Sequence, residues 1–351
     1  MTKDIVIVGA GVVGLTCAWI LAEEGFHVKI IANKVPSSFK DETDFTSPWA
    51  GAHFRPFPAN NAGDLKDFPM TRTTFAVFKE IAYKYPESSV SFMKGVDYVE
   101  ADEEPYTRLN PGYAEGLESF QVLDSRTLPA NVKFGSMYET WCLNAPLYLQ
   151  FLERRLRMYY GVEFVTATLI SLQHVSLNFP GATIINCSGM GLQYKGGYDT
   201  SCFQVRGQTL LVRAPKDCIY KNMTVTHRLS NEAFSFVIPR PCDGGVIVGG
   251  TRQPGNMAST PSLDDTENLV KHAVERFPEL LVYKEGIPTL DIVKVNVGFR
   301  PMRKGGVRLE KEIVGKATII HCYGFGSSGF EMSWGAAKHV SNIIDMVCSK
   351  L

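Results

Sequence analysis

The sequence predicts an α/β protein in which one domain is built on a parallel sheet and a second, β-rich domain of α+β character is inserted into it. Three observations support this prediction. The chain begins with a strand, a glycine turn, a helix and a strand, and its C-terminal part repeats the order strand, glycine turn, helix. Between these parts lie alternating apolar residues and turn signals, which are typical of antiparallel strands. At 351 residues the chain also exceeds the usual size of a single hydrophobic core.

The N-terminal stretch has the pattern of a Rossmann-like, dinucleotide-binding domain. It predicts a buried parallel strand over 4–8, a helix over 15–24 and a second strand over 28–32, with the turn Gly9-Ala10-Gly11-Val12-Val13-Gly14 after the first strand. Gly9 permits the tight turn, Gly11 lets the backbone approach a pyrophosphate, and Gly14 lets the helix lie close to the strand. The helix N-terminus then offers free N–H groups to the phosphates.

This pattern leaves the identity of the dinucleotide open. A carboxylate for the adenosine ribose is expected about twenty residues after the glycine turn, but the chain has Asn33 and Lys34 there. Asn33 can still hydrogen-bond a ribose hydroxyl. Lys34 is suited to a 2′-phosphate, so NADP stays an alternative at this point.

The next segments predict further elements in chain order. The loop 45–54 places small and hydroxyl-bearing residues beside aromatic ones, which suits close contact between backbone and a flat ligand. For residues 56–140 the sequence gives no clear prediction of helices or strands. A helix capped by Asn144 is expected next, followed by strands over 162–165 and 183–187. The second of these strands ends in Ser188-Gly189-Met190-Gly191, at the edge where open α/β sheets bind ligands.

The C-terminal half begins with antiparallel strands and then returns to the first domain. Residues 203–212 and 234–251 have strand character, with a hairpin signal at Asp243-Gly244. A strand over 317–321, a glycine turn over 323–329 and a helix from about residue 333 follow. We therefore predict a discontinuous first domain of residues 1–55, 145–192 and 300–351, and a second domain of residues 56–144 and 193–299.

Composition excludes several functional classes. The formal net charge is zero and there is no long basic run, which argues against nucleic acid and membrane surfaces as partners. No apolar stretch reaches the roughly 18 residues that span a bilayer, and the N-terminal apolar run is interrupted by glycines, unlike a signal peptide. The eight cysteines show no C-x-x-C and the histidines no ligand spacing, so we expect reduced thiols and no metal site. Homo-oligomerisation is left open.

The last three residues, Ser349-Lys350-Leu351, form a tripeptide that is read as a peroxisomal address. We therefore expect the protein in the peroxisome matrix, with an import receptor as a partner. This location favours an oxidase, because peroxisomes house reactions that make hydrogen peroxide.

Several motifs in order resemble the D-amino-acid oxidase family of FAD flavoproteins, which includes D-aspartate oxidase. Besides the N-terminal glycine turn they are Ser47-Pro48-Trp49-Ala50-Gly51-Ala52, Asn186-Cys187-Ser188-Gly189, Val205-Arg206-Gly207-Gln208, Gly249-Gly250-Thr251, Val297-Gly298-Phe299-Arg300-Pro301 and His321-Cys322-Tyr323-Gly324. Eukaryotic members carry an ending like the terminal tripeptide, and the Ser-Pro-Trp-Ala-Gly-Ala run is similar to yeast and fungal members. The resemblance covers nearly the whole chain.

This resemblance implies noncovalent FAD as the cofactor and largely removes NADP as an alternative. The pyrophosphate is expected near Gly11 and Thr46-Ser47, the flavin ring against Gly51-Ala52, and the adenine beside the backbone of Leu169. The full set of expected cofactor contacts is Gly9, Ala10, Gly11, Val12, Val13, Gly14, Asn33, Lys34, Thr46, Ser47, Ala50, Gly51, Ala52, Leu169, Ser188, Gly189, Gly324, Gly326, Ser327, Ser328, Gly329 and Phe330.

The resemblance also implies how a substrate binds. Arg300 is expected to hold the α-carboxylate, and the backbone carbonyl of Ser327 to accept the ammonium group. A planar guanidinium fixes a carboxylate through two parallel hydrogen bonds. Hydride transfer from Cα to flavin N5 needs orientation more than acid–base groups. The alternative is that Arg300 caps a structural carboxylate.

Three basic residues favour an acidic substrate, D-aspartate or D-glutamate. Arg252 follows Gly249-Gly250-Thr251, where neutral-substrate relatives carry an aromatic residue, and His53 lies where D-aspartate oxidases also carry histidine. Arg228 approximates a third basic position, although it could equally be a solvated loop residue. Phe236 differs from relatives that have a tyrosine to help hold the α-carboxylate.

The expected reaction converts the substrate and O2 to the 2-oxo acid, ammonia and hydrogen peroxide. The alternatives are an oxidase of neutral D-amino acids, an inactive flavin-binding protein and an NADP-dependent reductase.

Overall fold

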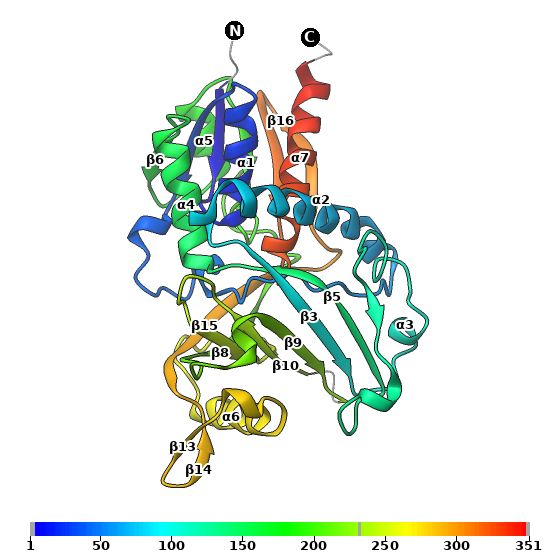
Figure 1. Cartoon of the computed structure of the whole chain (residues 1–351). Helices are drawn as coiled ribbons and strands as arrows, with labels where there is room; N and C mark the ends of the chain where they lie inside the picture. Colours follow the sequence, from blue (N-terminus) through cyan, green and yellow to red (C-terminus); the bar gives the residue numbers. More distant parts are fainter. Residues whose placement is uncertain (1–3, 231–232, 349–351) are drawn as a thin grey trace.

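A computed structural model describes residues 4–230 and 233–348, and it contains two large sheets (Figure 1). The first sheet is six-stranded. Its order in space is β16 (Arg308–Val314), β17 (Ala317–Tyr323), β7 (Thr183–Asn186), β1 (Asp4–Val8), β2 (His27–Ala32) and β6 (Glu163–Thr166). Neighbouring strands are parallel except for β16, which runs antiparallel to β17.

Helices cover both faces of this first sheet. Ile5 and Ile7 of β1 pack into a core with α1 (Val12–Glu23), α4 (Ala145–Met158) and α7 (Gly329–Cys348). Val6 and Val8 face the opposite core, which includes α5 (Leu172–Asn178). The apolar run at the N-terminus is therefore buried on both faces, as its pattern predicts. The α/β fold class is confirmed.

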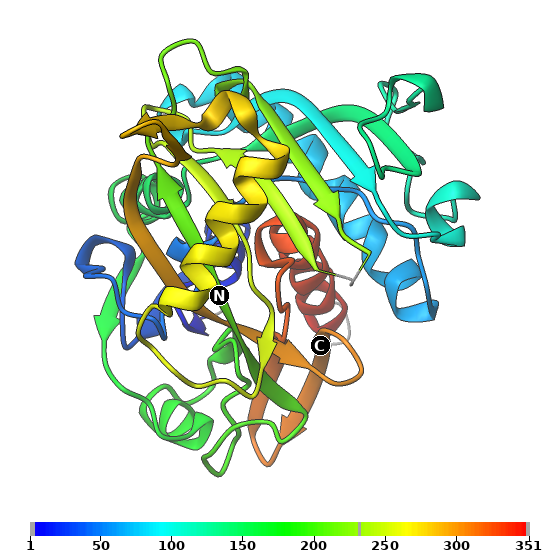
Figure 2. The same cartoon turned by 90° about the horizontal axis from the view of Figure 1, so that it is seen from below.

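The second sheet is nine-stranded. Its main path is β12 (Gln253–Pro254), β8 (Cys202–Val212), β11 (Val246–Gly249), β10 (Phe234–Pro239), β9 (Met223–Arg228), β3 (Ser91–Val99), β5 (Phe134–Cys142) and β4 (Gln121–Val122), and β15 (Ile292–Arg303) pairs with β8 off this path. Strands β10 and β11 form the hairpin predicted at Asp243-Gly244. Helix α6 (Leu263–Arg276) lies across the strands of this sheet (Figure 2) and packs through Leu269 and Ala273.

The sequence does not reveal helix α2 (Ala62–Lys84), because Pro69 interrupts its pattern. The helix is nevertheless well defined, since the Asn61 side chain accepts hydrogen bonds from the backbone N–H groups of Gly63 and Asp64. It packs against α7 so closely that a Cβ on Gly335 would lie 2.4 Å from the Cα of Met70. Residues assigned to the second domain thus pack on a helix of the first.

The remaining elements are short, and two of them, β13 (Val282–Lys284) and β14 (Ile287–Thr289), form a separate two-stranded antiparallel sheet. The others are α3 (Glu104–Thr107) and the 3-10 turns Pro36–Ser38, Ser47–Trp49, Pro86–Ser88, Ser125–Thr127, Ile219–Lys221 and Pro278–Leu280.

Some elements differ from the predictions in their details. Helix α7 begins at Gly329, not near residue 333, so the last residues of the glycine turn form its first turn. Asn144 precedes α4 without capping it, because its side-chain amide donates to the carbonyl of Pro241 instead. The boundary predicted at residue 300 falls inside β15, which belongs to the second sheet. The division into domains stays a prediction.

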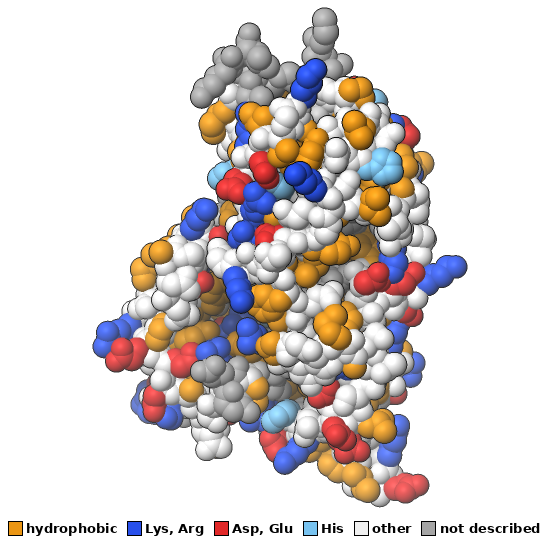
Figure 3. All heavy atoms as spheres, turned by 180° about the vertical axis from the view of Figure 1, so that it is seen from behind, with side chains coloured by type: hydrophobic (Ala, Val, Ile, Leu, Met, Phe, Trp, Pro, Cys, Tyr) orange, Lys and Arg blue, Asp and Glu red, His pale blue; other side chains and the backbone are white. Residues whose placement is uncertain are grey.

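The surface mixes charges of both signs. On the face seen in Figure 3, Lys and Arg side chains are interspersed with Asp and Glu side chains, in keeping with the zero formal net charge. Within the described part of the chain, no helix combines the length and hydrophobicity needed to cross a membrane.

Candidate active site

A large cavity lies where the carboxyl ends of the parallel strands meet the second sheet. Its volume is about 1360 Å³, and it is lined by the ends of β1, β2 and β17 and by residues of β8, β10 and β15. A pocket for a drug-sized ligand has roughly 300–1,000 Å³, so this cavity has room for a dinucleotide and a small molecule together. Ligands bind at this edge of open α/β sheets.

The glycine turn forms one wall of the cavity. Gly9 has φ +108°, and a Cβ there would lie 2.5 Å from the carbonyl oxygen of Cys187. A Cβ on Gly14 would lie 2.1 Å from the carbonyl oxygen of Gly9, so Gly14 brings α1 against the turn and does not itself line the cavity. Residues 9–13 do line it. Ser47 Oγ accepts a hydrogen bond from the Val12 N–H and thereby fixes the loop over the start of α1.

The expected adenosine end lies beside β2 and β6. Asn33, Lys34 and Leu169 all line the cavity. Asn33 Oδ1 accepts a hydrogen bond from the hydroxyl of Thr168 at 3.2 Å, and Lys34 forms an ion pair with Asp44. The lysine charge therefore already has a partner, which makes it less suited to a 2′-phosphate.

The two loops expected around the flavin ring also reach the cavity. Thr46 anchors the first loop by donating its hydroxyl to the carbonyl of Phe299 at 2.6 Å. A Cβ on Gly51 would meet Ile238 at 2.7 Å, so a larger residue would displace this loop. Opposite it lies the start of α7. The remaining predicted contacts line the cavity as well, and they are Thr46, Ser47, Ala50, Gly51, Ala52, Ser188, Gly189, Gly324, Gly326, Ser327, Ser328, Gly329 and Phe330.

Arg300 projects from β15 into the cavity. Its guanidinium lies over Gly207, where a Cβ would be 2.5 Å from Nη1, and Nη1 donates to the Thr251 carbonyl at 3.1 Å. Burial lowers the pKa of Arg300, and the nearby charge of Arg252 lowers it further. In the described segments 4–230 and 233–348 the guanidinium has no carboxylate partner, so the alternative role as a structural cap is not supported.

Arg252 lines the same cavity from the connection between β11 and β12. Its neighbours are fixed, because Thr251 Oγ1 accepts from the Gln208 N–H and the Gln253 amide donates to Asp265. The Arg252 side chain itself is exposed, although its place beside aromatic strands predicts burial. Because Arg252 is exposed, its side chain can reach a ligand in the cavity while its guanidinium stays hydrated. Phe236 lies nearby, with its ring against Gly249 and Gly250.

His53 lines the cavity, and its surroundings disfavour the protonated form of its ring. Burial, followed by the charge of Arg55, lowers the pKa of His53 to about 3. Its Nδ1 is buried and has no hydrogen-bond partner within the described residues. The neutral ring can offer one N–H donor and one acceptor to a ligand. The role of His53 toward an acidic substrate stays a prediction.

Arg228 does not line the cavity. It lies in β9 opposite Phe234, forms an ion pair with Glu103 and places its guanidinium 5.2 Å from the Phe234 ring centre. The ion pair with Glu103 gives the guanidinium a partner away from the cavity lining, and a role for Arg228 toward the substrate stays a prediction.

Among the cavity residues that the sequence does not single out are Arg55 and Glu331. Arg55 donates from Nε to Asp97 at 3.1 Å and from Nη2 to the Tyr106 hydroxyl at 3.1 Å. Its backbone N–H donates to Glu331 at 2.7 Å, and burial raises the pKa of Glu331 to about 7. The sequence does contain a signal for Arg55. In an extended chain alternate side chains point to the same side, so Arg55 is expected on the same side as His53, with the buried Phe54 on the other.

The cavity therefore fits a dinucleotide along the glycine turn and a small anion between Arg300 and Arg252. Because Gly9, Gly11 and Gly14 have no Cβ atoms, the backbone beside α1 leaves space for a ligand. At Gly11 an added Cβ would lie 3.1 Å from Ser47 Oγ. Together the fold and this cavity define a dinucleotide-binding protein with a second pocket for a small anion.

Comparisons with known proteins identify the family. The family model described as FAD dependent oxidoreductase matches residues 4–343. The chain is 35% identical to a D-aspartate oxidase of Talaromyces thermophilus, over 98% of this chain and 95% of the relative, and 34% identical to a D-amino-acid oxidase of Schizosaccharomyces pombe, over 95% and 94%. The solved glycine oxidase of Geobacillus kaustophilus has the same fold, with a TM-score of 0.73 and 17% identity over 98% of this chain and 95% of that one.

The chain belongs to the D-amino-acid oxidase and D-aspartate oxidase family of FAD-dependent oxidoreductases. Its cofactor is FAD, which confirms the prediction and removes the NADP alternative.

Proposed function

We propose that the protein oxidises acidic D-amino acids, D-aspartate and D-glutamate, to the 2-oxo acid and ammonia, with O2 reduced to hydrogen peroxide. The observation that carries this proposal is the pair Arg300 and Arg252. Both line one cavity, and neither has a carboxylate partner among the residues that the structure describes.

The charge balance of this pair favours a ligand with two carboxylates. Arg252 lowers the pKa of Arg300, which means that the two guanidinium groups repel each other. The α-carboxylate of any D-amino acid offsets one positive charge. A side-chain carboxylate offsets the other and removes the repulsion, and each guanidinium can bind its carboxylate through two parallel hydrogen bonds.

Other cavity residues support substrate orientation. The neutral ring of His53 provides a hydrogen-bond donor or acceptor without adding charge, and the Ser327 backbone carbonyl is proposed to accept the substrate ammonium. Phe234 and Phe236 add an apolar wall that excludes water from the Cα–H bond. When bound beside them, FAD supplies the hydride acceptor and passes the electrons to O2. The protein contributes binding and orientation, because no acid–base dyad is needed for this chemistry.

A second candidate is an oxidase of neutral D-amino acids. The wall formed by Phe234, Phe236 and Ile238 favours it, since it suits an apolar side chain. The exposure of Arg252 also lets this residue turn away from a neutral substrate without losing hydration. Among the relatives, both D-aspartate oxidases and D-amino-acid oxidases occur at similar identity.

A peroxide-release assay with paired substrates tests the proposal. D-Asp is compared with D-Asn and D-Glu with D-Gln, because each pair differs in charge at nearly constant shape, and D-Ala, D-Met and the L-isomers complete the panel. We expect the acids to exceed their amides in kcat/KM. Equal or higher values for the amides or for D-Met would support the second candidate, and no peroxide with any D-amino acid would indicate an inactive flavin-binding protein.

We also propose that the protein is imported into the peroxisome matrix by a receptor that binds Ser349-Lys350-Leu351. These residues lie outside the described part of the chain, so the support comes from the tripeptide alone. A variant without the tripeptide should keep its activity and disperse to the cytosol. Continued import of the shortened protein would contradict the proposal.

A further inference from the structure

The cavity contains one carboxylate that forms no ion pair among the described residues. The acidic side chains that line the cavity are Asp44, Asp265 and Glu331. Each of the two aspartates is held in an ion pair with a lysine or an arginine. Glu331 instead accepts the backbone N–H of Arg55 through Oε1 at 2.7 Å, and its Oε2 has no hydrogen-bond partner in the same part of the chain. Glu331 is therefore available to a positively charged group of a ligand.

Glu331 lies near the carbonyl that is proposed to accept the substrate ammonium. It is in the first turn of α7, and Ser327 lies two residues before that helix. Both residues line the cavity, together with Arg300 and Arg252. A D-amino acid with an acidic side chain has two carboxylates and one ammonium group. The two arginines and Glu331 match these charges in number and in sign.

The ammonium group of a substrate must lose a proton before oxidation. Nitrogen in an ammonium ion has no lone pair, whereas the C=N bond of the first product forms from such a lone pair. Hydride transfer itself needs no acid–base dyad, but the earlier proton needs an acceptor. The acceptor has to be within reach of the substrate nitrogen and ionised at the working pH.

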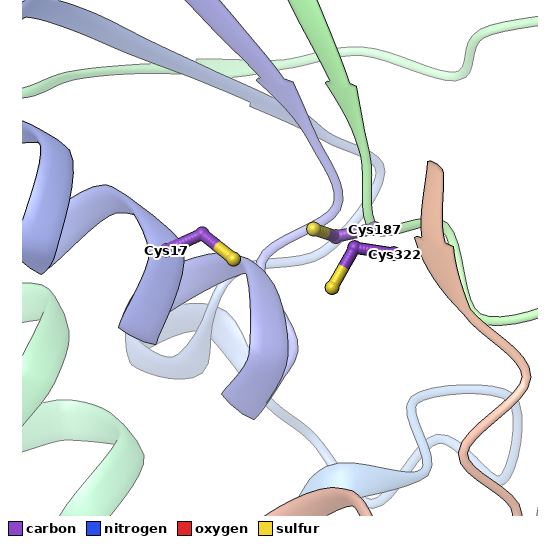
Figure 4. Close-up of side chains that lie close together, drawn as sticks. All are labelled: Cys17, Cys187 and Cys322. Carbon is purple, nitrogen blue, oxygen red and sulfur yellow. The ribbon is translucent and has the colours of Figure 1, made fainter. Parts of the chain in front are cut away.

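Other titratable side chains of the cavity suit this role less well. Burial, followed by the charge of Arg55, lowers the pKa of His53 to about 3, so its ring is a weak proton acceptor. The thiols of Cys187 and Cys322 line the cavity beneath the glycine turn, where Figure 4 shows them with Cys17, and the three Sγ atoms lie within 4.8 Å of one another. Hydrogen bonding to Cys17 raises the pKa of both thiols. They also lie at the turn that is expected to hold the pyrophosphate.

Charged groups from three segments surround Glu331. Burial is the main cause that raises its pKa to about 7, and the charge of Asp97 in β3 adds to this effect. The backbone N–H and the charge of Arg55 act in the opposite direction, as does the charge of Arg72 in α2. Because Arg55 Nε donates to Asp97 at 3.1 Å, these two charges offset each other. The Glu331 carboxylate is therefore ionised above about pH 7 and can accept a proton there.

We propose that Glu331 is a catalytic residue whose carboxylate binds the substrate ammonium and accepts one proton from it before the Cα–H bond breaks. This inference rests on the proposed function, because it requires a D-amino acid in the cavity. The proton moves from nitrogen to Oε2, and the electron pair of the N–H bond stays on nitrogen as a lone pair.

The remaining steps balance this proton. The Cα–H electron pair leaves as hydride to FAD, and the nitrogen lone pair forms the C=N bond. The resulting iminium ion of the substrate reacts with water to give the 2-oxo acid and an ammonium ion. Glu331 then releases its proton to solvent, which balances the proton consumed when O2 becomes hydrogen peroxide.

The test is the pH profile of kcat/KM for the FAD-loaded enzyme, measured by peroxide release with its best substrate among the D-amino acids. This profile reports groups of the free enzyme and the free substrate. Glu331→Gln is the main variant, because the amide oxygen can still accept the Arg55 N–H but takes up no proton. Glu153→Gln is the matched control. Glu153 is also a buried carboxylate on a helix, but it lies outside the cavity in an ion pair with Arg157.

We expect kcat/KM of the unmodified enzyme and of Glu153→Gln to rise as the pH increases through about 7. Glu331→Gln should lose about a hundredfold at pH 7, within the usual range for a lost general base. Its kcat/KM should rise only at higher pH, where the substrate ammonium loses its proton in solution. Rates are normalised to flavin content, and Glu331→Ser, which keeps a hydrogen-bond acceptor, replaces the glutamine variant if the latter does not retain FAD.

The outcomes separate this inference from the proposed function. A Glu331→Gln profile with the same shape as that of the unmodified enzyme would overturn the role as proton acceptor, even if the rates were uniformly lower. Absence of a rise near pH 7 in the unmodified enzyme would overturn it as well. In both cases the oxidase activity itself would stand. Absence of peroxide with every D-amino acid would overturn the inference and the proposed function together.

Discussion

Replacing Arg252 by Met is expected to weaken the preference for acidic substrates. Arg252 and Arg300 line one cavity, but Arg300 is half-buried and Arg252 is exposed. Methionine removes the charge while keeping an unbranched side chain of similar length. The variant should therefore lose activity on D-Asp and D-Glu, whereas activity on D-Met should hold or rise.

The exposure of Arg252 sets the size of this effect. A desolvated charge pair that loses one partner costs about 2–5 kcal/mol. A solvent-exposed pair contributes about 0.2–1 kcal/mol. We take the upper end, about 1 kcal/mol, because Arg252 stands beside aromatic rings and a second cation. The ratio of kcat/KM for D-Asp over D-Met should then fall about fivefold.

Steady-state peroxide assays at low and high salt measure this ratio. Added salt screens an exposed pair, so the preference of the unmodified enzyme for D-Asp should decrease with salt, and that of Arg252→Met should not. Arg228→Met is the matched control, because this arginine lies outside the cavity in an ion pair with Glu103 and its loss should leave the ratio unchanged. An unchanged ratio in Arg252→Met would refute the role of Arg252, and a fall in Arg228→Met would refute the geometry of the site.

Three further predictions concern the rest of the cavity. Arg300→Ala should reduce kcat/KM for every substrate alike, by about thirty- to a thousandfold for a loss of roughly 2–4 kcal/mol, and near-normal activity would remove Arg300 from the site. Gly11→Val should lower the FAD content of the purified protein, measured by flavin absorbance, because a side chain there crowds Ser47 and the phosphate path; full occupancy would contradict this. Burial raises the pKa of Glu331 from an ordinary value near 4.5 to about 7. The folded protein therefore binds this proton more tightly than the unfolded protein does. The resulting contribution to folding stability is fully present below about pH 4.5 and is lost as the pH rises through 7. Glu331→Gln should flatten that part of the pH–stability curve, by up to about 3 kcal/mol, and an unchanged curve in chemical denaturation would show that Glu331 does not titrate in this range.

The sequence alone is informative where a backbone conformation demands a particular residue. Gly9 requires a positive φ and Gly14 a close approach to the turn, and both requirements are met in the structure. The apolar run of β1 is a second local constraint, because a central parallel strand is buried on both faces. Its residues alternate between two cores, with Ile5 and Ile7 in one and Val6 and Val8 in the other. These local constraints are sufficient to predict the parallel sheet and the cofactor site.

Helix α2 shows where local signals fail. Its apolar residues are buried by segments distant in the chain: Phe75 packs on the rings of Phe54 and Phe92, and Phe78 packs on those of Trp141 and Tyr148. Pro69 interrupts the pattern, and the helix owes its stability to tertiary packing more than to propensity. Such a helix is difficult to predict from periodicity.

The sequence motif that contains Arg300 predicts its place in the site, but the electrostatic surroundings of the site residues could not be predicted from the sequence. Burial and then the charge of Arg55 lower the pKa of His53, and Arg228 forms an ion pair with Glu103. Burial and ion pairing depend on residues distant in the chain. For the same reason the cluster of Cys17, Cys187 and Cys322 exists only in the folded protein. Backbone geometry is encoded locally and was determined by the sequence itself, whereas solvation, charge and ligand spacing depend on three-dimensional proximity and were decided by the tertiary structure.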